Sequence, residues 1–190
     1  MTILGFFGRS RHFENLISDY RPRLWRLAYS WCSNRHLADD LVQDACTKAL
    51  HHHAQLREAD ALGGWLCRIL ANVWNDHLRT RKNTTDIDDV AESELPEIAG
   101  PEDDYSLNET VRRVRLAVAE LPAGQREVVT LVDLEEFSYA EVATILEIPI
   151  GTVMSRLSRA RLSLREKLRE QPAASQLAEP RSASVHRLRA

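Results

Sequence analysis

The sequence predicts an all-α protein with two small helical domains joined by a flexible acidic linker. Apolar residues recur at spacings of three and four over long stretches, and almost no segment alternates apolar and polar residues as a strand would. Glycine and proline are scarce, at seven residues each. Residues 83–108 contain nine acidic side chains, no basic one and few large apolar groups. Such a segment cannot form a core, so we expect it to be the linker.

The net charge of −3 hides a strong segregation of charge along the chain. Residues 1–82 carry 12 basic and 8 acidic side chains, and residues 109–170 carry ten of each. Within the second region, six basic residues lie between Met154 and Arg169 beside a single acid, Glu166. Local patches of this kind, rather than the net charge, decide whether a protein can bind nucleic acid.

No apolar run is long enough to span a membrane, and the N-terminus lacks the basic region and cleavage site of a secretory signal. The three cysteines, Cys32, Cys46 and Cys67, form no CxxC pair and are odd in number. We therefore expect reduced thiols in a cytoplasmic protein without direct membrane contact. No nucleophile–base set, phosphate-binding glycine loop or metal-ligand spacing is present, so we expect neither an enzyme nor a cofactor.

Two helices are expected in the first third of the chain. Residues 12–33 are amphipathic, and Pro22 is expected to kink or restart this helix. A second helix, from about residue 37 to 52, places Leu41 inward and Asp40, Gln43 and Asp44 on or near the opposite side. Such an acidic, amide-bearing face can simply be solvated, or it can dock on a basic partner.

Three adjacent histidines, at positions 51–53, follow this helix. Adjacent residues on a helix point in different directions, so the three imidazoles cannot easily share one zinc ion. We interpret them as a polar helix end, where imidazolium groups are favoured by the helix dipole.

A third helix is expected over residues 65–82, after a polar loop at residues 55–64. One face is apolar, and the opposite face carries a line of basic and amide side chains: Arg68, Asn72, Asn75 and Arg79. A polar face with nearby aromatic residues can hold unstacked bases. Of the two tryptophans in this helix, we expect Trp65 to anchor the core.

Helices at 109–121 and 125–134 support a helix-turn-helix at residues 137–168. Ser138 and Glu141 have the spacing of a capping box, and Pro149 suits the first position of the next helix. The second helix of the motif packs one apolar face. Its other face presents hydroxyl and guanidinium groups, from Thr152, Ser155, Arg156 and Arg159. Arginine can bind guanine with two hydrogen bonds, and serine or threonine can bind bases or phosphates, although an ordinary solvated helix face is the alternative.

The order of these motifs resembles the extracytoplasmic-function (ECF) group of bacterial sigma factors over about residues 12–168. The matching segments are DLVQD at 40–44, WLCRILANVWNDHLRTR at 65–81, the acidic linker, LPAGQREVVTL at 121–131 and FSYAEVATILEIPIGTVMSRLSRAR at 137–161. The resemblance implies a sigma-2 domain at 12–82, the linker at 83–108 and a sigma-4 domain at 109–169. Residues 1–11 form an N-terminal extension outside it, and the unmatched tail at 170–190, rich in Ala, Ser, Pro and Arg, is expected to be disordered.

The resemblance also implies partners and roles. The polymerase-binding residues would be Asp40, Leu41, Gln43 and Asp44, on the β′ clamp helices of core RNA polymerase, with the β flap as a further contact. The 55–64 loop and the face formed by Arg68, Asn72, Asn75 and Arg79 would capture a flipped base and open the −10 promoter element. The −35 element would be read by Ser155, Ser158 and Arg159, with Thr152, Arg156 and Arg161 on phosphates. The linker would enter the RNA channel of the polymerase, and an anti-sigma factor would hold the protein inactive.

The sequence departs from the family at Met154, because that position is commonly basic there. Two other hypotheses remain. A DNA-binding regulator that does not dock on polymerase would leave residues 40–44 and 65–81 unexplained. A protein that mimics a sigma factor to titrate an anti-sigma factor would have little need of arginines on the 152–163 face.

Overall fold

The computed structural model describes residues 3–56, 61–84 and 109–170. The predicted linker, the predicted tail after residue 170 and the middle of the 55–64 loop lie outside these residues. Within the described ranges every regular element is helical: α1 (Ile3–Cys32), α2 (Arg35–His51), the 3₁₀ turn η1 (His53–Gln55), α3 (Leu62–Thr84), α4 (Glu109–Ala119), α5 (Ala123–Asp133), α6 (Tyr139–Leu146) and α7 (Ile150–Glu170). The all-α prediction is confirmed.

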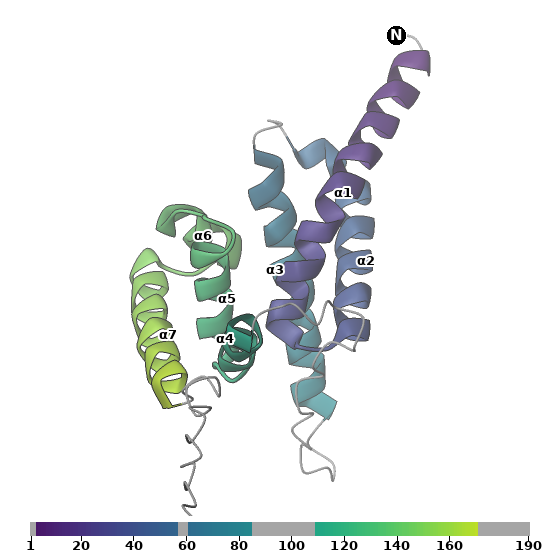
Figure 1. The fold of residues 1–190 in the computed structure, drawn as a ribbon. Helices are drawn as coiled ribbons and strands as arrows, with labels where there is room; N and C mark the ends of the chain where they lie inside the picture. The colour runs from purple at the N-terminus through teal and green to yellow at the C-terminus, as the bar shows by residue number, and fades with distance from the viewer. Residues whose placement is uncertain (1–2, 57–60, 85–108, 171–190) are drawn as a thin grey trace, which may run out of the picture.

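Helices α1, α2 and α3 form one bundle, and α4–α7 form a second group beside it (Figure 1). The core of the first bundle contains Leu24, Trp31, Val42, Leu66 and Leu70, each of which is buried to at least 99%. Burial of such side chains stabilises the fold by about 1.5–3 kcal/mol each relative to exposure. Packing in this bundle buries one side of α3 and leaves the opposite side available to a ligand.

Helix α1 continues through Pro22 without a break, which differs from the predicted restart. Proline removes one intrahelical hydrogen bond and crowds the preceding turn. Pro22 lies on the exposed side of α1, where water can satisfy the carbonyl group that loses its partner. The buried residues that follow, Leu24, Leu27 and Ala28, hold the helix in register beyond it.

The helix-turn-helix is formed by α6 and α7. Ser138 accepts a hydrogen bond from the Glu141 amide and the Glu141 carboxylate accepts one from the Ser138 amide, so the predicted capping box is confirmed. The turn begins at Glu147, which adopts a left-handed conformation with φ of 55°. Pro149 precedes α7 rather than opening it, because its carbonyl accepts the amide hydrogens of Thr152 and Val153.

The two helical groups pack through α1 with α4 and α5, and through α3 with α6. The N-terminal part of α1 projects beyond the other helices, away from α4–α7 (Figure 1). No helix in the described part of the chain is both long enough and apolar enough to cross a membrane. Across the same residues, no cluster of three or more histidine, cysteine or acidic side chains could hold a metal ion.

Candidate nucleic-acid interface

The predicted polar face of α3 exists as one line of side chains. Arg68, Asn72 and Arg79 are exposed and Asn75 is half-buried, whereas Leu66 and Leu70 on the other side are completely buried. A residue recurs on the same face of a helix every three or four positions, which aligns these four side chains over three turns. They present hydrogen-bond donors and two positive charges on a single surface, which we call the α3 face.

Two pockets, each of 370 Å³, open along the α3 face. Trp65, Arg68 and Asn72 line the first pocket, together with Lys48, His52 and Gln55 from the end of α2 and the following turn. Asn72 also lines the second, with Asn75, Arg79, the last residue of α6, Leu146, and the first residue of the following turn, Glu147. Both volumes fall in the range of pockets that accept a small organic group. The first combines aromatic, cationic and amide groups, which are the groups that bind an unstacked base.

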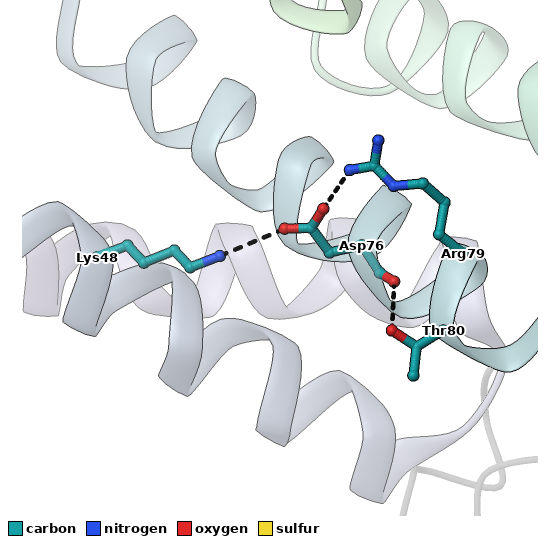
Figure 2. A network of polar contacts seen from close by, with 4 residues as sticks. All are labelled: Lys48, Asp76, Arg79 and Thr80. Atoms are coloured by element: carbon teal, nitrogen blue, oxygen red, sulfur yellow. Dashed lines mark hydrogen bonds and ion pairs between the residues drawn. The ribbon is translucent and has the colours of Figure 1, made fainter. Parts of the chain in front are cut away.

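Asp76 contacts two cationic side chains near the C-terminal end of the α3 face. Its carboxylate pairs with Arg79 and lies 3.6 Å from the ammonium group of Lys48 on α2, and Figure 2 shows it between these two cations. The hydrogen bond from Arg79 is the main cause that lowers the pKa of Asp76, and the charge of Lys48 contributes further. Thr80 donates to the Asp76 carbonyl at 3.0 Å (Figure 2). Asp76 therefore pairs with cations of two helices, Arg79 of α3 and Lys48 of α2.

The predicted polymerase-binding residues divide into two kinds. Asp40, Gln43 and Asp44 are exposed on the outer side of α2, where a partner can reach them. Leu41 is only 3% exposed and belongs to the core of the bundle. It supports the helix from inside, and cannot itself contact a partner in this conformation.

The outer face of α7 carries the predicted −35 residues. Ser155, Ser158 and Arg159 are exposed, and Thr152 is half-buried. Val153, Leu157 and Ala160 are buried on the opposite side, as the pattern of the sequence predicts. The exposed face also includes Ile150 and Met154, which are 50% and 53% exposed.

Two of the predicted phosphate ligands of α7 have partners within their own domain. Arg161 donates to both carboxylate oxygens of Asp133, at 2.6 and 3.2 Å. Arg156 is half-buried over Gly124, where its guanidinium atoms lie 2.8–3.3 Å from the place a Cβ atom would occupy. A larger side chain at position 124 would require the end of Arg156 to shift. To bind phosphate as predicted, Arg161 must release or share its contact with Asp133, and Arg156 must leave or share its position over Gly124.

The structure reveals functional candidates that the sequence did not single out, and they lie between the two helical groups. Trp31 Nε1 donates to Thr130 Oγ1 at 2.8 Å, and Trp74 Nε1 donates to Glu127 Oε1 at 2.9 Å. Arg23 pairs with Glu135, and Arg126 donates to the Trp31 carbonyl. The partners in these four contacts are 53 to 112 residues apart in sequence, so no local pattern could have indicated them.

Glu127 is the most unusual ionisable group of this interface, since it is only 6% exposed. Burial raises the pKa of its carboxyl group, and the hydrogen bond from Trp74 and the charges of Arg156 and Arg126 oppose that effect. Burial also lowers the pKa of Arg126, whose Nε–H has no partner within the described part of the chain.

The α3 face itself receives a residue from the other helical group. Arg68 Nε and Nη2 donate to the same carboxylate oxygen of Glu147, at 3.0 and 2.7 Å. Both side chains are about half exposed, at 48% and 55%. The turn between α6 and α7 thus reaches one of the two cations of the α3 face, Arg68.

The three cysteines are free thiols. Cys67 is buried, and this burial raises its pKa to about 12. Burial raises the pKa of the half-buried Cys32 and Cys46 as well. A thiol with a raised pKa is a poor nucleophile, so these cysteines contribute packing rather than chemistry.

Comparisons with known proteins agree with this arrangement. The family model for sigma-70 region 2 matches residues 16–84, and the model for sigma-70, region 4 matches residues 111–164. The first match covers the α1–α3 bundle and the second covers most of α4–α7. The combination defines a sigma-70-type subunit, which directs transcription initiation by bacterial RNA polymerase.

Individual relatives show to which group of sigma-70-type subunits this chain is similar. The ECF RNA polymerase sigma factor SigW of Bacillus subtilis is 29% identical over 167 residues, covering 83% of this chain and 89% of that protein. The RNA polymerase sigma-H factor of Pseudomonas aeruginosa is 31% identical over 170 residues, covering 85% and 88%. The sigma factor RpoE of Bartonella quintana, solved in complex with the anti-sigma factor NepR, superposes with a TM-score of 0.71 at 30% identity, covering 85% of this chain and 99% of that one. The chain belongs to the ECF RNA polymerase sigma factors.

Proposed function

We propose that three separate surfaces of this chain each have a distinct role in promoter-specific initiation. The outer side of α2 docks on core polymerase, the α3 face holds the −10 element, and the outer face of α7 reads the −35 element. The observation that carries this division is the α3 face: four donor-bearing side chains in one line, ending at a pocket that combines Trp65, Arg68 and Asn72.

The first pocket supports a role for α3 in opening the promoter. Extrusion of a base from a duplex costs a few kcal/mol, and a pocket must compensate this cost by stacking and hydrogen bonding. Trp65 supplies an aromatic surface, Asn72 can donate to and accept from a base edge, and Arg68 supplies a cation. Asn75 and Arg79 extend the same line and would follow the strand beyond the captured base.

The α7 face supports recognition of a duplex upstream. In a helix-turn-helix, the N-terminal residues of the second helix contact base edges in the major groove. Ser155, Ser158 and Arg159 occupy this position and are exposed. Arg159 is the candidate for a guanine, while Thr152, Arg156 and Arg161 would contact phosphates.

The outer side of α2 supports docking on the polymerase. Asp40, Gln43 and Asp44 are exposed on one helix, and α2 is held from behind by its buried residues, including Leu41. An anti-sigma factor is a further proposed partner. The related RpoE was solved with the anti-sigma factor NepR, and its chain is covered over almost its whole length.

A binding and transcription experiment with the full chain tests this proposal. Asp40→Ala/Gln43→Ala should lose binding to core polymerase and lose run-off transcription. Its fold should be retained, because surface substitutions usually change stability by less than about 0.5 kcal/mol. Asn15→Ala/Asp19→Ala, at two exposed positions of α1, is the control, because it also removes one amide and one carboxylate. Full core binding by the double variant would exclude the docking role of α2 and would favour a DNA-binding regulator that acts without it.

A further inference from the structure

We propose that Glu147 is an intramolecular competitor for promoter DNA: in the free chain the α6–α7 turn closes over the α3 face, and the −10 element can bind only after the two domains separate. The proposal rests on the assignment of the α3 face to DNA. It adds that the chain restrains itself, without any second protein.

The contact occupies the place where a phosphate would bind. The Glu147 carboxylate accepts two hydrogen bonds from Arg68, at 3.0 and 2.7 Å. A carboxylate and a phosphate compete for one guanidinium group because both are anions that accept charge-assisted hydrogen bonds. Glu147 already takes the Nε–H and one Nη2–H of Arg68 and offsets its charge, so a phosphate at this guanidinium group must displace the carboxylate or bind with weaker attraction.

The obstruction is also steric. Leu146 and Glu147 form the wall of the second pocket, opposite Asn72, Asn75 and Arg79. A strand that followed the α3 face from Arg68 to Arg79 would therefore pass through the space that the end of α6 occupies. The left-handed conformation of Glu147 ends α6 here and directs the chain into the turn.

Buried contacts hold this arrangement, so the exposed ion pair does not act alone. Trp31 with Thr130 and Trp74 with Glu127 join the domains through buried hydrogen bonds of 2.8 and 2.9 Å. Arg23 adds an ion pair with the buried Glu135. Because each of these donors lies in the α1–α3 bundle and each acceptor lies in α4–α7 or the turn after α5, all three contacts are lost when the domains separate.

Only open molecules can bind DNA. The apparent binding constant for DNA is therefore the binding constant of the open form multiplied by the fraction of molecules that are open. By the same coupling, any partner that binds only the open form increases DNA binding. Core polymerase is the candidate for such a partner, because docking through α2 leaves the α3 face free to receive DNA.

A charge-swap cycle on the full chain tests the proposal without polymerase. Donor and acceptor dyes are attached through non-natural amino acids at Thr47 on α2 and Glu166 on α7, both exposed and away from the interface. The variants are Glu147→Arg, Arg68→Glu and the two combined. Glu120→Arg is the matched control, since Glu120 is 53% exposed and pairs with Lys167 inside the second domain.

We expect Glu147→Arg and Arg68→Glu each to raise the open-to-closed ratio by about fivefold, because each reversal removes the attraction of an exposed ion pair and replaces it with repulsion. The combined variant should return to the transfer efficiency of the original chain, and Glu120→Arg should not change it. Far-UV circular dichroism checks that each single variant is folded. High transfer in all variants would show that the Arg68–Glu147 pair does not hold the domains together, and low transfer in the original chain would exclude the closed state.

Binding of a fluorescein-labelled single-stranded oligo(dT) provides the second readout. Glu147→Arg should bind it more tightly than Glu120→Arg, although both add the same charge. Equal affinity would show that Glu147 does not compete with DNA. This result would leave the assignment of the α3 face untouched, since that assignment is tested separately by run-off transcription with Arg68→Glu.

Discussion

Trp74 of α3 donates its indole N–H to the buried carboxylate of Glu127 on α5, at 2.9 Å. This bond joins the domain that carries the α3 face to the domain that carries the helix-turn-helix. It also places an acid where water cannot solvate it, and burial raises the pKa of Glu127 as a result.

The first prediction concerns the pH dependence of stability. A raised pKa in the folded state means that the ionised carboxylate of Glu127 lowers stability at neutral pH, and that this penalty disappears as the pH falls through the folded pKa toward the unfolded one. Glu127→Gln keeps an acceptor for Trp74 without the charge. We expect it to raise the free energy of unfolding at pH 7 by on the order of 1 kcal/mol, and to lose this advantage in acid.

Urea unfolding at several pH values measures this difference. Glu120→Gln is the control, because Glu120 is exposed and its carboxylate is solvated. An advantage of Glu127→Gln that is constant with pH, or a loss of stability at pH 7, would show that the carboxylate is not penalised by burial.

The second prediction concerns the capping box of α6. Ser138→Ala removes the acceptor for the Glu141 amide and should lower the free energy of unfolding by about 1 kcal/mol. Ser138→Asp keeps a capping oxygen and should recover most of this loss. Denaturant unfolding followed by circular dichroism checks both variants; equal stability of all three chains would mean that the cap contributes nothing.

The third prediction concerns Met154, which is 53% exposed on α7. Met154→Arg adds a cation beside Ser155 and Ser158, where the proposed interface meets the duplex. If it reaches a phosphate, the plot of log binding constant against log salt concentration should steepen by about 0.9 for the one added contact. Fluorescence anisotropy with duplex promoter DNA measures the slope, and Met154→Leu serves as the uncharged control. A slope unchanged by the arginine would place this position outside the interface.

The fourth prediction separates two arginines of α7. Arg159 is exposed and points away from its own domain's core, so Arg159→Ala should cost about 1–3 kcal/mol on a −35 element with the correct guanine and little on a mismatched one. Arg156 packs over Gly124, so Arg156→Ala should weaken binding evenly across sequences. Competition binding with matched and mismatched duplexes distinguishes them, and identical profiles would refute the assignment of roles.

Much of the fold was predictable because it depends on local periodicity. The inward face of α7, from Val153 to Ala160, and the capping box at Ser138 follow from spacings within a few residues. Two local details differ from the prediction. Helix α1 does not restart at Pro22, which faces solvent, and Pro149 lies before α7, where its carbonyl accepts the amide hydrogens of the first turn.

The interface between the domains could not be predicted in this way. Glu147 is 79 residues from Arg68, and Thr130 is 99 residues from Trp31. The sequence shows Arg68 on a polar helical face and Glu147 in a turn, but it does not show that the two meet. Only the packing of two separate domains brings them together, whereas the burial of Leu41 agrees with its inward position in the periodicity of α2.

Run-off transcription with core polymerase tests the central claim most directly, using a promoter identified by mapping transcript starts after overexpression of the protein. Addition of the original chain should produce a transcript that core polymerase alone does not make. Arg68→Glu and Arg159→Glu, which reverse one charge on each DNA-binding surface, should each abolish it. A transcript of undiminished strength with both reversals combined would contradict the account.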